Sequence, residues 1–190
     1  MARLRERLQQ AEVAALAAQD WAGKRGDWSD RLDIARREVF GLERYRPDQL
    51  ATINASMAGQ DVILIMPTGG GKSLTYQLPA VVSPGLTLVV SPLLSLMQDQ
   101  IMGLTKLGVR AEMLTATTDQ DTKKRVLKEM LDPSKDPLKL LYVTPEKCSK
   151  SKQFMAKLQK VHQASGILNN LLSRGCQSSP AGWAVQPTRH

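Results

Sequence analysis

The chain has 190 residues, of which 42% are hydrophobic and 23% are charged, and its formal net charge is +8. This length favours one folded unit with a core, and this composition excludes a chain that is disordered throughout. Uninterrupted apolar runs such as Val62–Met66 are far shorter than the roughly 20 residues that cross a bilayer, so we expect no membrane partner.

The positive charge is concentrated in the second half of the chain. Residues 119–164 contain 11 Lys and Arg against 6 Asp and Glu, whereas residues 61–118 contain 3 of each kind. Such an excess suits a polyanionic partner, although a solvated basic face is the alternative interpretation. Two cysteines, Cys148 and Cys176, give no basis for a disulfide framework.

Helix-forming residues dominate the N-terminal part of the chain. Residues 1–27 read as a helical extension followed by a glycine-containing linker. A second helix is expected from Ser29 to about Phe40, because Gly41 follows its end. A third helix is expected from Pro47, a residue that is favoured in the first turn, to about Met57. We therefore expect an α-helical N-terminal extension before the main fold.

From Asp61 onward, short apolar runs alternate with helical stretches, as in a parallel sheet with crossover helices. The predicted strands are Val62–Met66, Leu86–Val90, Ala111–Thr115 and Leu138–Val143. The predicted helices are Lys72–Ala80, Leu93–Leu107, Asp119–Leu131 and Ser149–His162. The expected fold class is α/β. After Ala164 the residues become Ser, Gly, Gln, Asn and Pro without acidic residues, so residues 165–190 are predicted to be a divergent, disordered tail.

The strongest chemical signal is the loop Met66-Pro67-Thr68-Gly69-Gly70-Gly71-Lys72-Ser73, between a predicted strand and a predicted helix. Three consecutive glycines allow backbone N–H groups to face phosphate oxygens without obstruction by side chains. Lys72 adds a positive charge for the β- and γ-phosphates and is the candidate catalytic residue. Ser73 can ligate Mg²⁺ through its hydroxyl. A glycine-rich turn that binds no ligand is the alternative, but the flanking strand and helix favour a nucleotide triphosphate.

The chain resembles RecQ-type DNA helicases of superfamily 2, and within them the short vertebrate members, over about residues 28–164. Four ordered blocks carry this resemblance. They are Phe40 to Gln49, Met66 to Ala80, Ser91 to Gln100 and Tyr142 to Lys147. The resemblance implies the RecA-like fold of a P-loop NTPase lobe, namely the first helicase lobe.

The resemblance also implies roles for individual residues. Adenine recognition maps onto Arg46 and Gln49, and a glutamine amide offers the donor and the acceptor that the adenine edge requires. Single-stranded or forked DNA would follow the turns after two strands. The implied DNA-binding residues are Ser91, Pro92, Leu93, Thr144 and Lys147. Capping turns with solvated lysines are the alternative interpretation of these blocks.

The stretch Thr115-Ala116-Thr117-Thr118 looks like the Thr-Ala-Thr element that couples hydrolysis to strand movement in such helicases. In the family, however, that element follows the acidic magnesium motif, whereas here it precedes the Thr144-Pro145-Glu146 block. We therefore interpret it as a strand end and a helix cap.

One element of the family is missing from the sequence. Hydrolysis needs carboxylates for the magnesium shell and the attacking water, usually as Asp-Glu, and the chain contains no Asp-Glu dipeptide. We therefore expect an incomplete first lobe, from a truncated or alternatively spliced product or a mispredicted gene. The resemblance implies ATP and Mg²⁺ as cofactors, 3′-to-5′ movement and a nuclear location.

Two other functions remain open at this point. The chain could be a non-enzymatic module that binds DNA or pairs with the full-length helicase. A DEAD-box-type RNA helicase is a further alternative, although the blocks after Ser91 and Thr144 do not look like the corresponding motifs of RNA helicases.

Overall fold

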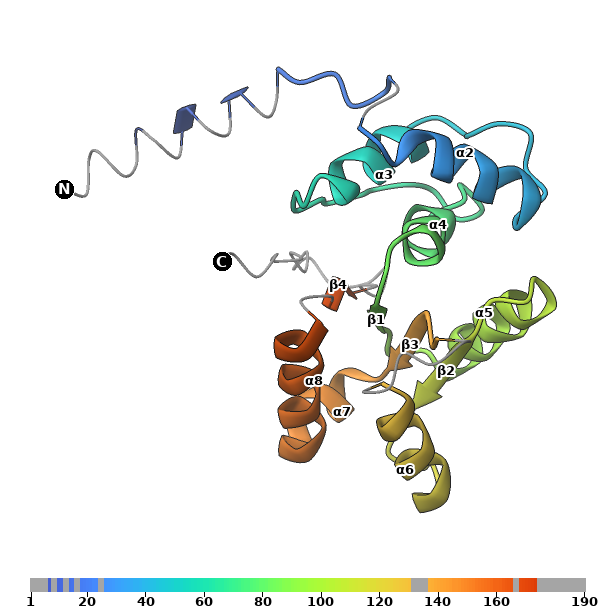
Figure 1. The fold of residues 1–190 in the computed structure, drawn as a ribbon, viewed down its shortest axis with the longest axis vertical. Helices are drawn as coiled ribbons and strands as arrows, with labels where there is room; N and C mark the ends of the chain where they lie inside the picture. Colours follow the sequence, from blue (N-terminus) through green and yellow to red (C-terminus); the bar gives the residue numbers. More distant parts are fainter. Residues whose placement is uncertain are drawn as a thin grey trace.

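The computed structural model describes residues 7, 10–11, 14–15, 18–23, 26–130, 137–165 and 168–173 of the chain. Its centre is a parallel sheet with the strand order β2-β3-β1-β4 (Figure 1). The strands are β1 (Leu86–Val90), β2 (Ala111–Leu114), β3 (Leu140–Val143) and β4 (Leu168–Ser173). The predicted α/β class with a parallel sheet is confirmed. Within the described ranges, no helix combines the length and the hydropathy needed to cross a bilayer.

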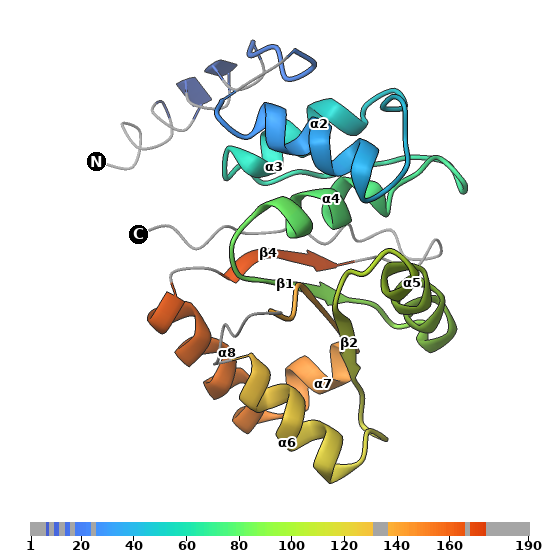
Figure 2. The same cartoon turned by 45° about the vertical axis from the view of Figure 1, so that its right-hand side comes forward.

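Helices flank this sheet on both sides. Figure 2 shows α2, α3 and α4 on one side of the sheet and α6, α7 and α8 on the other. The helices before the second strand are α2 (Ser29–Glu38), α3 (Gln49–Met57), α4 (Leu74–Val82) and α5 (Leu94–Lys106). Those after it are α6 (Gln120–Glu129), α7 (Pro145–Lys150) and α8 (Lys152–Ser165). Each helix predicted between Ser29 and His162 is therefore present, with its ends shifted by a few residues.

Strands β1 and β3 are buried on both faces, as their apolar sequences predict. Leu88 packs in one cluster with side chains of α6 and α8, such as Val126 and Phe154. Its neighbour Val89 points to the opposite face and packs in a second cluster with residues of α4 and α5, such as Met97. Because successive strand residues face opposite sides, one strand contributes to two cores.

The N-terminal helices pack on α4 instead of on the sheet. A third apolar cluster joins Leu32 of α2 and Ile53 of α3 to Leu78 of α4, and all three side chains are at most 1% exposed. The fully buried Asn54 then ties the preceding segment to α3, since its Nδ2 donates to the carbonyls of Trp21 and Gly23, both at 2.9 Å. The helix predicted over residues 2–19 lies mostly outside the described residues, but residues 7, 10–11 and 14–15 are helical.

The strand predicted at Val62–Met66 is wrong. These residues form no strand, and the side chains of Ile63 and Ile65 are 69% and 91% exposed. A parallel strand is stable only where a neighbouring strand can accept its hydrogen bonds. The two edges of β1 are already occupied by β3 and β4, and residues 62–66 pair with no strand of the described sheet.

The prediction of a tail without regular structure is also wrong for residues 168–173. These residues form β4, which pairs in parallel with β1 at Leu86↔Leu168 and Leu88↔Leu171, with an irregularity between them. The sequence pattern does not indicate this strand, because Asn169 and Asn170 have low strand propensity. The remainder of the predicted tail, residues 174–190, lies outside the described residues.

Candidate functional site

The glycine-rich loop turns the chain from Met66 into α4. Gly69 and Gly71 have φ angles of 79° and 88°, a left-handed conformation that residues with a side chain rarely adopt. The N–H of Gly70 donates to the carbonyl of Pro67 at 3.1 Å. Ser73 occupies the N-cap of α4, so this helix begins at Leu74 and not at Lys72 as predicted. The glycines are therefore required by the shape of the turn.

The ammonium group of Lys72 lies against the same loop. Its Nζ donates to the carbonyl of Met66 at 2.6 Å and to the carbonyl of Pro67 at 2.8 Å. These two bonds hold the start of the loop to its end. The fold thus directs the ammonium group of Lys72 into the loop. A bound phosphate would replace the two carbonyls as the partner of this cation.

The structure brings Arg46 and Gln49 to this loop from more than 20 residues away. The side-chain amide of Gln49, which is 3% exposed, donates to the carbonyl of Gly71 at 2.9 Å and accepts from the N–H of Arg46 at 2.8 Å. The guanidinium of Arg46 donates to the carbonyl of Gly69. The residues predicted to recognise the base and those predicted to bind the phosphates thus form one hydrogen-bonded unit.

An open hollow of about 520 Å³ lies beside this unit and is lined by the seven residues from Gly41 to Pro47. Arg36 of α2 fixes its wall, because its guanidinium donates to the carbonyl of Leu42 and lies 5.0 Å from the centre of the Tyr45 ring. Burial of the Tyr45 hydroxyl, and then the charge of Asp33, raise the pKa of Tyr45 above its ordinary value. The ring is therefore neutral and held in place.

The predicted DNA-binding residues lie at the carboxyl edge of the sheet. The register Val90↔Val143 places Ser91 and Thr144 just after aligned ends of β1 and β3, and both are less than 9% exposed. Pro92 and Leu93 follow Ser91 and are exposed. The hydroxyl of Thr144 accepts from the N–H of Lys147 at 3.3 Å and caps α7. The structure thus brings both turns to one edge.

Comparison with known families decides the identity of this arrangement. The family model described as DEAD/DEAH box helicase matches residues 46–168, which include the glycine loop and both strand-end turns. The chain belongs to the DEAD/DEAH box helicase family.

Individual relatives point to one branch of these helicases. The chain is 55% identical to "ATP-dependent DNA helicase Q-like 2" of Arabidopsis thaliana over 80% of its own length and 21% of the relative. It is 50% identical to "ATP-dependent DNA helicase Q1" of Rattus norvegicus over 77% of its length and 24% of the relative. It is 47% identical to "RecQ-like DNA helicase BLM" of Xenopus laevis over 65% of its length and 9% of the relative. The resemblance to RecQ-type helicases is confirmed, and the chain spans no more than a quarter of these relatives.

This helicase chain also contains a polar link that the sequence did not reveal. Gln100 of α5 accepts hydrogen bonds from the amide of Gln77 at 2.8 Å and from the hydroxyl of Tyr76 at 3.4 Å. Both donors belong to α4, the helix that follows the glycine loop. Gln77 and Gln100 lie in two of the blocks that carry the resemblance, but only the packing of α4 against α5 shows that they bond to each other.

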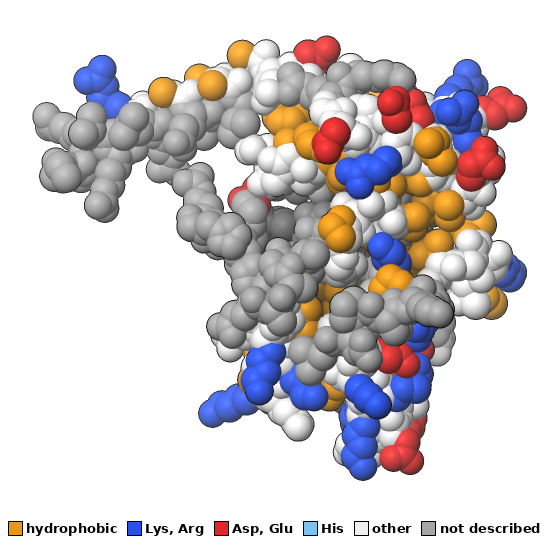
Figure 3. Space-filling model, viewed as in Figure 1, with side chains coloured by type: hydrophobic (Ala, Val, Ile, Leu, Met, Phe, Trp, Pro, Cys, Tyr) orange, Lys and Arg blue, Asp and Glu red, His pale blue; other side chains and the backbone are white. Residues whose placement is uncertain are grey.

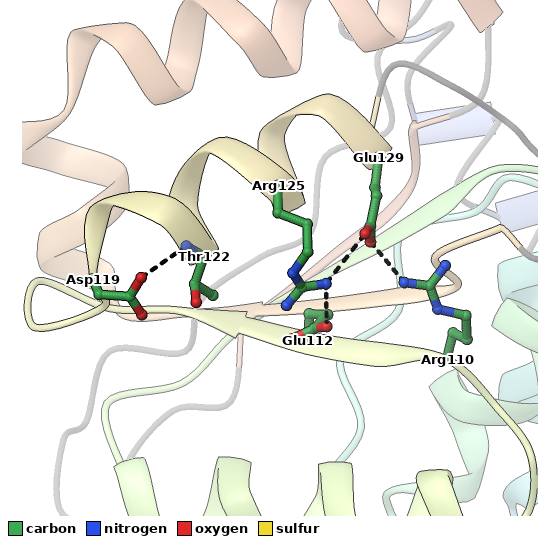
Figure 4. Close-up of polar contacts among 6 residues, drawn as sticks. All are labelled: Arg110, Glu112, Asp119, Thr122, Arg125 and Glu129. Carbon is green, nitrogen blue, oxygen red and sulfur yellow. Dashed lines mark hydrogen bonds and ion pairs between the residues drawn. The ribbon is translucent and has the colours of Figure 1, made fainter.

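An ion-pair network holds α6 against β2 in the helicase fold. Arg125 of α6 pairs with Glu112 of β2 at 2.9 Å and with Glu129 at 3.2 Å, and Arg110 pairs with Glu129 at 2.6 Å (Figure 4). Hydrogen bonds to Glu112 and Glu129 raise the pKa of Arg125 further, so its charge is permanent. The network fixes the helix that begins beside the carboxyl edge of the sheet.

Proposed function

We propose that this chain supplies the ATP-binding and DNA-binding surfaces of the first lobe of a RecQ-type ATP-dependent DNA helicase, over residues 28–164. The observation that carries this proposal is the bond from Gln49 to Gly71, because it joins the amide that is proposed to recognise the base to the loop that is proposed to bind the phosphates. The RecQ-type relatives are named as ATP-dependent DNA helicases, which supports ATP and DNA as ligands.

In this proposal Lys72 binds the β- and γ-phosphates, and the N–H groups of Gly69 to Gly71 face the phosphate oxygens. Gln49 and Arg46 recognise the adenine. The hydroxyl of Ser73, at the N-cap of α4, is the type of oxygen ligand that Mg²⁺ prefers. When bound, the metal would neutralise phosphate charge during phosphoryl transfer.

Nucleotide binding tests this part of the proposal directly. Titration of the chain with ATP in the presence of Mg²⁺, followed by calorimetry, should give a Kd that rises at least roughly tenfold in Lys72→Ala, because a charge-assisted contact is lost. Lys106→Ala removes an exposed lysine at the end of α5 and is the matched control. Equal affinity of the wild type and Lys72→Ala would contradict the proposal.

Single-stranded or forked DNA is proposed to cross the carboxyl edge of the sheet at Ser91, Pro92, Leu93, Thr144 and Lys147. Backbone N–H groups at strand ends, together with lysines, suit phosphate contacts that do not depend on base sequence. Movement in the 3′-to-5′ direction, a nuclear location and a role in repair and recombination extend the proposal from the family.

We also propose that these residues alone do not unwind DNA. The sequence contains no Asp-Glu dipeptide to organise hydrolysis, and translocation needs a second lobe that closes over ATP. The missing Asp-Glu dipeptide equally supports the second candidate function, a non-enzymatic module that binds DNA or the full-length helicase. ATPase activity measured with and without single-stranded DNA separates the two. DNA-stimulated turnover that Lys72→Ala abolishes supports the enzyme, whereas DNA binding without turnover supports the module.

A further inference from the structure

The loop after β2 is held in shape by its own threonine hydroxyls. The hydroxyl of Thr118 accepts from the N–H of Thr115 at 2.9 Å. The hydroxyl of Thr115 lies 3.0 Å from that of Thr117 and 3.1 Å from that of Thr118. The interpretation of this stretch as a helix cap is wrong, because Asp119 caps α6 by accepting from the N–H of Thr122 at 2.8 Å (Figure 4). The threonines therefore build a fixed turn that the helix itself does not require.

This turn lies beside the turn that is proposed to contact DNA. The register Leu114↔Val143 aligns the ends of β2 and β3, so Thr115 and Thr144 are the next residues of two adjacent strands. Adjacent strands lie about 4.8 Å apart, which puts the two turns within the span of one phosphodiester unit. Thr115 is 6% exposed, whereas Thr117 is exposed to solvent.

Two lysines lie on the helices that follow these two turns. Lys123 comes from the second turn of α6 and Lys147 from α7, and both side chains are half-buried. Burial and then the nearby charge of Lys123 lower the pKa of Lys147 below its ordinary value. Among the described residues neither ammonium group has an ion-pair partner, although the adjacent Lys124 lies 4.0 Å from Asp121. Two cations near each other, neither with an ion-pair partner, favour an anion between them.

We propose that Lys123 and Lys147, together with the exposed hydroxyl of Thr117, bind one backbone phosphate of single-stranded DNA, which extends the nucleic-acid surface to the end of β2. This inference rests on the proposed function. It adds Lys123 and Thr117 to that surface, two residues that the sequence analysis assigned to a predicted helix and to a helix cap.

The charge of the neighbouring helix favours a polymer over a free phosphate ion. Helix α8 contains Lys152, Lys157 and Lys160 and no acidic residue. Figure 3 shows Lys and Arg side chains gathered over the lower part of the molecule, where α6 and α8 lie, with fewer acidic ones. A single ion would use only the lysine pair, whereas a strand of DNA can follow the whole basic surface.

The test measures binding of a fluorescent single-stranded oligonucleotide by anisotropy between roughly 50 and 200 mM salt. For Lys123→Ala we expect an affinity loss of roughly threefold to tenfold and a decrease in the salt slope of about 0.7, the value for one phosphate contact on a single strand. Lys124→Ala is the matched control, because it removes the same charge from the next residue of α6. Circular dichroism checks that both variants fold, and Thr117→Val tests the hydroxyl without changing the charge.

Each outcome decides the inference. If the wild type binds and Lys123→Ala equals Lys124→Ala in affinity and salt slope, the inference fails and the proposed function stands. If the wild type does not bind the oligonucleotide, both fail. A titration with inorganic phosphate separates the two sources of the anion, since binding of phosphate that requires Lys123, without any effect of Lys123→Ala on the oligonucleotide, would overturn a DNA site.

Discussion

The side-chain amide of Gln77 on α4 donates a hydrogen bond of 2.8 Å to the side-chain oxygen of Gln100 on α5. Helix α4 follows the glycine loop and its Lys72, whereas α5 follows the turn that begins at Ser91. The bond is partly buried, and it joins a helix that follows the proposed ATP site to a helix that follows the proposed DNA site. A shift of either helix therefore changes the geometry of this hydrogen bond. It is a physical route by which ATP and DNA could affect one another.

Replacement of Gln100 by alanine should uncouple the two ligands. We expect the affinities for ATP alone and for DNA alone to stay within roughly twofold, while the factor by which one ligand changes the affinity for the other approaches one. Loss of a hydrogen bond worth about 0.5–1.5 kcal/mol corresponds to a coupling change of roughly two- to twelvefold. The measurement is ATP titration with and without saturating oligonucleotide.

Gln98→Ala is the matched control for this experiment, because Gln98 lies on the same helix and is exposed. It should leave the coupling factor unchanged. A coupling factor of one in the wild type, or an unchanged factor in Gln100→Ala, would show that this hydrogen bond does not couple ATP binding to DNA binding.

The unpaired segment before the glycine loop gives a direct test of the fold. Ile65 is 91% exposed and Leu88 of β1 is 1% exposed. Ile65→Ser should therefore change the free energy of unfolding by less than about 0.5 kcal/mol, as surface substitutions do. Leu88→Ala should lower it by about 2–5 kcal/mol, because it leaves a cavity in the core. Urea denaturation measures both, and a loss of several kcal/mol in Ile65→Ser would mean that residues 62–66 form the buried strand that the sequence predicts.

The network between β2 and α6 should contribute measurably to stability. The Arg110 and Glu129 side chains are 28% and 27% exposed, so solvent screens their ion pair only in part. A double-mutant cycle with alanine at both positions should give a coupling energy of about 0.5–1 kcal/mol that decreases as salt is added. The same cycle on Asp121 and Lys124, whose side chains are 97% and 80% exposed, should give no measurable coupling. Equal values for the two cycles would contradict a structural role for the network.

The cap of α6 should make stability depend on pH. The hydrogen bond from the backbone N–H of Thr122 to Asp119 lowers the pKa of this carboxyl below its ordinary value. A carboxyl whose pKa is lower in the folded state adds stability above its unfolded pKa, and this contribution is lost as the pH falls through the folded pKa. The wild type should thus exceed Asp119→Ala in stability at pH 7, and the difference should shrink below about pH 4.

Asp119→Asn separates the charge from the cap, because asparagine also caps helices and does not titrate. The stability difference between Asp119→Asn and Asp119→Ala should be the same at pH 7 and pH 3. A difference between wild type and Asp119→Ala that does not change with pH would show that the hydrogen bond does not stabilise the ionised carboxyl.

Sequence alone predicted the elements whose apolar pattern matches their burial. Leu86–Val90 is apolar throughout apart from Thr87 and is buried on both faces, and α5 has clear boundaries between Leu93 and Gly108. Val62–Met66 has the same apolar character, but such a run cannot specify which strand would pair with it. The strand at Leu168–Ser173 was missed for the opposite reason, because its two asparagines have low strand propensity and its pairing depends on the edge of β1 that β3 does not occupy.

The residues of the site also differ in how far the sequence predicts them. The glycine loop is local, so its residues can be recognised in one short stretch. The link from Gln77 to Gln100 and the approach of Lys123 to Lys147 depend on how helices that are distant in sequence pack over the sheet. No periodicity or spacing in one chain reports such contacts, although Gln77, Gln100 and Lys123 all lie on predicted helices.

The position of Gly71 constrains the side chain of Gln49 as well as the glycine loop. A Cβ atom at residue 71 would collide with the side-chain nitrogen of Gln49, and the φ of 88° disfavours any residue with a side chain. A methyl group at this position would break the hydrogen bond between Gln49 and the loop without changing any charge. The proposed recognition of the base by Gln49 is therefore sensitive to a change in volume at a residue that has no side chain of its own.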